Sequence, residues 1–83
     1  MKEKIQALVD SKIAKLNVFV DDAYISKEEG KNILNIVLDS SEVIDLNRVT
    51  DASRMINKII DKDQELLKDI DEVDIFSKEK GDV

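Results

Sequence analysis

Hydrophobic residues recur along this chain with two different spacings, and both occur between Lys31 and Arg54. In the β-branched-rich run 33–39, Leu34, Ile36 and Leu38 share one face at period two, which is typical of a strand buried on that face. After a break at 40–42, apolar residues recur every three or four positions, as on one stripe of an α-helix: Leu46, Val49, Ala52 or Ser53, Ile56, Ile59 and Ile60. A helix that follows its strand directly can fold back over it, so we expect this strand–turn–helix unit to organise the fold.

The residues before this unit predict a helix and a strand. Apolar positions at helical spacing predict a helix over residues 2–16: Ile5, Leu8, Val9, Ile13 and Leu16. Residues 18–25 predict a strand whose alternation is interrupted near Asp21 and Asp22. The interruption indicates either a β-bulge or an edge strand protected by carboxylates, and we favour the edge strand. Residues 26–30 predict the hairpin loop, with Gly30 available for positive φ.

The residues after the break predict a helix and a third strand. Asp45 stands where an N-cap is needed, and the helix should extend to about Asp61 or Lys62. Residues 64–70 predict either one more helical turn or a packed loop, and residues 72–77 predict a strand. The polar residues 78–83 are typical of a frayed tail.

These elements predict one α+β domain over residues 1–83, with the two-layer order α-β-β-α-β. Two helices should pack on one face of a three-stranded sheet. The β-α-β connection makes the third strand parallel to the second, while its place beside the first or the second strand stays open.

Composition narrows the possible functions. The 83 residues contain neither cysteine nor histidine, which excludes disulfides, thiolate metal sites and imidazole catalysis. No apolar run reaches the roughly 20 residues of a membrane helix, and the N-terminus does not resemble a signal peptide, so we expect a cytoplasmic protein. The formal net charge is −6. It is concentrated between Asp61 and Asp74, a segment that should repel phosphate backbones and suit a basic protein, or else simply keep a linker and edge strand solvated.

The residues argue against three possible chemistries. Residues 61–72 place acids at calcium-loop spacing, but Leu66 stands where such a loop needs glycine. Asp39-Ser40 has the order found at the modified serine of acyl carrier proteins, yet a polar Ser-Glu pair follows and the neighbouring runs are β-branched. The carboxylate pair Asp21-Asp22 has no accompanying group that would make it catalytic. We therefore expect no enzyme activity, no cofactor and no metal.

The element order is also that of KH-type RNA-binding domains, which grip RNA with a Gly-x-x-Gly loop between two helices. This chain has only Gly30 and Gly81, and neither lies between helices. Its aromatic residues are scattered in sequence and predict no stacking platform: Phe19, Tyr24 and Phe76.

The chain resembles the N-terminal domain of the RimP family of bacterial ribosome maturation factors. The resemblance rests on the order of elements and on short motifs: Val20-Asp21 with Tyr24, the hairpin Gly30, Leu34-Asn35-Ile36-Val37-Leu38-Asp39, Ile44-Asp45-Leu46, Ser53-Arg54, and Val73-Asp74-Ile75-Phe76-Ser77. Two departures accompany it. The family's Ser-Ser-Pro-Gly-Leu turn is replaced here by Lys78-Glu79-Lys80, and the family's C-terminal SH3-like domain would begin only after Val83.

The resemblance implies a domain that assists assembly of the small ribosomal subunit by binding rather than by catalysis. We expect the partner to be a basic ribosomal protein, with RNA contact left open, no DNA or membrane, and a monomeric chain. We expect partner contacts on the second helix and at the hairpin: Arg48, Arg54, Lys58, Asp21 and Asp39. Asp39 could instead cap a turn, and Arg54 could serve helix packing. The alternative function is a freestanding acidic domain for protein interaction or oligomerisation through a strand edge.

Overall fold

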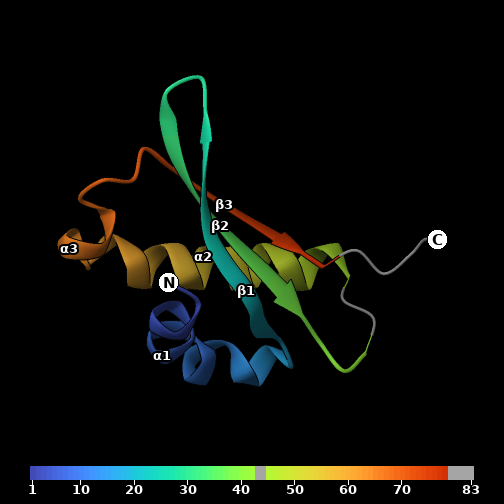
Figure 1. Cartoon of the computed structure of the whole chain (residues 1–83). Helices are drawn as coiled ribbons and strands as arrows, with labels where there is room; N and C mark the ends of the chain where they lie inside the picture. Colours follow the sequence, from blue (N-terminus) through green and yellow to red (C-terminus); the bar gives the residue numbers. More distant parts are fainter. Residues whose placement is uncertain (43–44, 79–83) are drawn as a thin grey trace.

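A computed structural model describes residues 1–42 and 45–78, and these residues form an α+β domain (Figure 1). Its elements, in chain order, are α1 (Lys2–Ile13), the 3-10 turn η1 (Ala14–Leu16), β1 (Phe19–Glu28), β2 (Lys31–Asp39), α2 (Leu46–Asp61), the short α3 (Gln64–Leu67) and β3 (Glu72–Ser77). This confirms the predicted order and shows that residues 64–67 form the extra helical turn. In the described part of the chain, every helix is too short or too polar to cross a lipid bilayer.

The strands form one sheet in the order β1-β2-β3, so β2 is the central strand. β1 and β2 are antiparallel neighbours joined by the hairpin, and β3 is parallel to β2. The predicted direction of the third strand is therefore confirmed. Its position, which the sequence left open, is beside β2.

The hydrophobic core lies between the sheet and the helices, which all cover the same face of the sheet (Figure 1). Leu34, Ile36 and Leu38 of β2 are fully buried, as predicted. The buried residues of the two long helices are spaced four apart and belong to the same core cluster as these β2 residues: Ile5, Val9 and Ile13 from α1, and Ala52, Ile56 and Ile60 from α2. The helical stripes expected from the spacing of apolar residues are thus the surfaces that cover β2.

The start of α2 differs from the prediction in one respect. Asp45 is the N-cap, as expected, and its Oδ1 accepts a hydrogen bond of 2.8 Å from the backbone N–H of Arg48. Leu46, predicted as the first residue of the buried stripe, is however 80% exposed. The buried stripe begins only at Ala52, because the first turn of α2 precedes the part of the helix that packs on the core.

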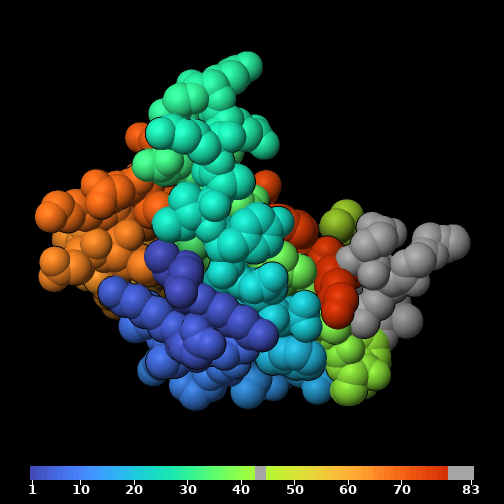
Figure 2. Space-filling model, in the orientation of Figure 1, coloured from blue at the N-terminus to red at the C-terminus, as the bar shows by residue number. Residues whose placement is uncertain are grey.

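The hairpin is longer and its turn tighter than predicted. Residues 26–28 belong to β1, and the turn consists of Glu29 and Gly30 alone. Both have positive φ, 50° and 81°, which is the geometry that matches the twist of a two-residue hairpin. The tip of the hairpin projects beyond the body of the molecule (Figure 2), and residues 27–31 are exposed.

β1 combines both interpretations offered for its interrupted alternation. It lies at an edge of the sheet, and its register with β2 shifts between Val20 and Asp22, which makes Asp21 a bulge. At Val20 the outer edge is closed by α1: Asp10 Oδ1 accepts from its N–H, and Gln6 Nε2 donates to its carbonyl, each at 2.9 Å. This part of the edge is therefore closed to another strand.

Candidate functional site

The sheet has a second face, opposite the core, on which none of the described helices packs. We call it the open face. Paired residues of neighbouring strands share a face, so the register defines its members: Phe19, Asp22, Tyr24, Ser26 and Glu28 from β1, Lys31, Ile33, Asn35, Val37 and Asp39 from β2, and Glu72, Asp74 and Phe76 from β3. It combines apolar, aromatic and acidic side chains.

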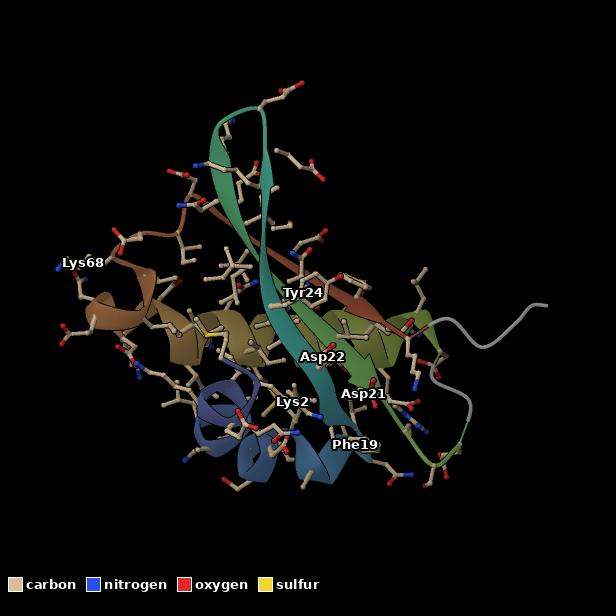
Figure 3. The ribbon with its side chains drawn as sticks, in the orientation of Figure 1. Lys2, Phe19, Asp21, Asp22, Tyr24 and Lys68 are labelled. Carbon is tan, nitrogen blue, oxygen red and sulfur yellow. The ribbon has the colours of Figure 1, made fainter. Side chains whose placement is uncertain are left out.

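The aromatic residues of the chain gather on this face. Phe76 pairs with Val37 in the centre of the sheet, and Phe19 and Tyr24 lie on the neighbouring β1. Both β1 aromatics are 44% exposed, and Figure 3 shows them along the same strand. Sequence reasoning missed this gathering, because Phe19 and Tyr24 have opposite parity and share a face only through the bulge at Asp21.

Carboxylates occupy the hairpin end of the open face. Glu28, Glu72 and Asp74 line a hollow of about 370 Å³ together with Ile33, Asn35 and Val73. Within residues 1–42 and 45–78, none of these three carboxylates forms an ion pair or accepts a hydrogen bond. The hollow therefore presents negative charge, with Lys31 opposite Glu28 in the register as the nearest cation on this face.

The acids at the other end of the sheet have local partners. Asp22 Oδ1 accepts from the N–H of Ala23 at 2.8 Å, and Asp39 Oδ1 accepts from the N–H of Ser40 at 2.7 Å. Asp39 thus caps the turn after β2, the alternative that the sequence offered for it. Asp21, in the bulge, lies 3.6 Å from Lys78 Nζ.

The predicted contact residues do not form a single site. Asp21 and Asp39 lie at the end of the sheet where β2 finishes, whereas Arg48 lies in the first turn of α2 with its Nη1 3.0 Å from Glu42 Oε1. Arg54 and Lys58 are exposed further along α2. Their roles as partner contacts stay predictions.

Lys58 belongs to a second hollow, in the helix layer. This groove has a volume of about 410 Å³, with Met55 and Ile59 as its apolar floor and lysines around it: Lys12, Lys58 and Lys62. The two hollows therefore have opposite charge, acidic on the open face and basic between α1 and α2.

Part of the acidic segment is structural. Asp63 caps α3 by accepting from the N–H of Leu66 at 3.0 Å, and Asp71 Oδ2 accepts from the N–H of Asn32 at 2.7 Å. Leu66 is only 6% exposed and belongs to the hydrophobic core. Among the described residues, no three acidic side chains converge as metal ligands.

The open face is suited to recognising cations attached to an apolar body. Carboxylates attract ammonium and guanidinium groups, and exposed aromatic rings bind them through their π faces. The same charges repel a phosphate backbone. A scan against models of known protein families finds no match to this chain, and a search of curated proteins finds none either.

Proposed function

We propose that this domain is a binding module of a RimP-like ribosome maturation factor, which assists assembly of the small ribosomal subunit in the cytoplasm. It acts by binding, without catalysis and without a cofactor. The likeness of its motifs to the RimP family supports the ribosomal part of this proposal. The open face supports the binding part and is the observation that carries it.

The open face has the chemistry of a site for a basic protein. Protein interfaces favour aromatic residues at their centre and polar residues at the rim, and here Phe19, Tyr24 and Phe76 lie among carboxylates. Ribosomal proteins are rich in lysine and arginine, so an acidic surface steers them towards the domain and speeds their association. It also keeps the domain from binding RNA indiscriminately.

The test is capture of small ribosomal subunits by the immobilised chain from a low-salt lysate, followed by the same experiment with purified subunits. Phe19→Ala with Tyr24→Ala should abolish capture, because both exposed rings leave the open face. The matched control is Ile25→Ala with Leu46→Ala, which removes exposed apolar side chains, 48% and 80% exposed, that are not on this face. Failure of the unaltered chain to enrich small subunits would overturn the ribosomal role.

A freestanding oligomerisation domain is the second candidate, and the outer edge of β3 is the observation that favours it. β3 is hydrogen-bonded to β2 on one side, and no described strand pairs with its other side. Self-association there would bring the acids of two β3 strands together, which opposes it. A monomeric mass in light scattering at high protein concentration would remove this candidate.

A further inference from the structure

We infer that the groove between α1 and α2 is a docking site for an acidic amphipathic helix of a partner protein. We call it the helix groove, and it is lined by Lys12 from the last turn of α1 and by Met55, Lys58, Ile59 and Lys62 from α2. It lies in the helix layer, whereas the open face lies on the other side of the sheet. The inference therefore goes beyond the proposed function and assigns a second kind of partner to a second surface.

The floor of the helix groove is apolar and only partly used by the core. Met55 and Ile59 lie three residues after the buried Ala52 and Ile56, on the neighbouring stripe of α2. Both are half-buried and pack against the core, and their remaining surface lines the groove. An apolar side chain placed against this surface would leave water, which stabilises a complex. Methionine adapts to partner side chains of different shapes, so it suits such a floor.

The rim of the helix groove is basic, although the whole chain carries a formal net charge of −6. Lys58 and Lys62 are four residues apart on α2, a spacing at which like charges repel each other, and Lys12 adds a third cation from α1. Asp61 follows Lys58 by three residues, yet among the described residues neither it nor any of the three lysines forms an ion pair. The described chain thus supplies no paired counter-charge for the rim, and carboxylates of a partner would provide one.

An acidic protein helix fits both features of the groove, whereas other anions fit only one. An RNA phosphate backbone would meet the lysines but has no apolar group for the floor, and the net negative charge of the chain opposes it. A small apolar anion needs a site that encloses most of its surface, and none of the five residues that line the helix groove is buried. An amphipathic helix lays an apolar stripe into a groove and can carry carboxylates on both sides of that stripe. Those carboxylates match the lysines that α1 and α2 contribute.

The experiment is an NMR titration of the whole chain with a blocked peptide, acetyl-EELEELLEELEE-amide, whose leucines recur at helical spacing among glutamates. Two matched peptides separate the two features: in one, serine replaces every leucine, and in the other, glutamine replaces every glutamate. We expect the first peptide to cause saturable shifts of the backbone amides of Met55, Lys58, Ile59 and Lys62. Each matched peptide should bind at least about tenfold more weakly, because one loses the apolar contact and the other loses the charge pairs. Absence of a saturable shift with the first peptide would overturn the inference.

A pair of variants locates the site. Lys58→Gln with Lys62→Gln should weaken binding of the first peptide by about tenfold, because two cations of the rim are lost. Lys4→Gln with Lys27→Gln changes the net charge equally at exposed positions on α1 and β1, and should leave binding nearly unchanged.

Three outcomes would show that the site is not what we infer. Equal weakening by both pairs of variants would mean general charge attraction. Equal binding of the leucine and serine peptides would mean that the apolar floor has no part in binding. Tighter binding of oligouridine than of the first peptide would make the groove a phosphate site.

The outcome is independent of the ribosomal role. A response of the helix groove to the acidic peptide without capture of small subunits would keep the groove and remove the proposed function. Capture of small subunits without that response would remove the groove and keep the function.

Discussion

The two faces of the central strand differ completely in what they present. On the covered face, Leu34, Ile36 and Leu38 have no exposed surface and meet helices from both sides of the sequence. On the open face, the intervening Asn35 and Val37 lie among acids and aromatic rings that no described helix covers. A shift of one residue along β2 thus separates the part of the strand that stabilises the fold from the part that we expect to bind a partner.

Successive residues of β2 lie on opposite faces of the sheet, so each one either packs in the core or lies on the open face. From Leu34 to Leu38 the covered face of β2 is apolar, which a chain of 83 residues needs because so small a domain buries a limited fraction of its surface. The open face keeps several carboxylates close together, and among the described residues Glu28, Glu72 and Asp74 form no ion pair that would offset their repulsion. Residues that weaken a fold without an evident structural gain are expected at binding sites.

The largest expected effect on stability distinguishes two neighbouring residues of β2. Ile36→Ala leaves a cavity under both helices and should lower the free energy of unfolding by about 2–5 kcal/mol. Val37→Ala removes a half-buried side chain from the open face and should cost less than about 1.5 kcal/mol. Chemical denaturation of the two variants measures the difference directly. Equal losses would show that the open face contributes to stability as much as the core.

Much of the fold can be predicted from the sequence, because a helix or strand that is buried on one side carries apolar residues at a regular spacing. The stripes of α1 and β2 predicted the core, and Asp45 predicted the start of α2. The hairpin turn was misjudged because Glu29-Gly30 lacks the Asn-Gly or Asp-Gly signature of a two-residue turn. The exposure of Leu46 depends on where the helix meets the sheet, which no local pattern contains.

The candidate site was harder to predict than the fold. Its residues come from three strands, so their proximity depends on the strand order and on the bulge, neither of which the sequence determines. One signal was present, since the parity of β2 already assigned Asn35 and Val37 to the face opposite the core. Only their charge predicts Arg48, Arg54 and Lys58 as contacts, and the structure places them on α2, away from the open face.

The smallest expected effect on stability concerns the carboxylates of the open face, and it is also the most informative. Glu72→Gln with Asp74→Asn should leave the free energy of unfolding unchanged or raise it by up to about 0.5 kcal/mol, because two like charges on one strand are removed and no described ion pair is lost. The increase should disappear at 1 M salt, where the Debye length falls to about 3 Å. Urea denaturation at low and high salt measures both effects. A loss above about 1 kcal/mol would mean that these acids support the fold, whereas unchanged stability together with weakened capture of small ribosomal subunits would mean that they are kept for the partner.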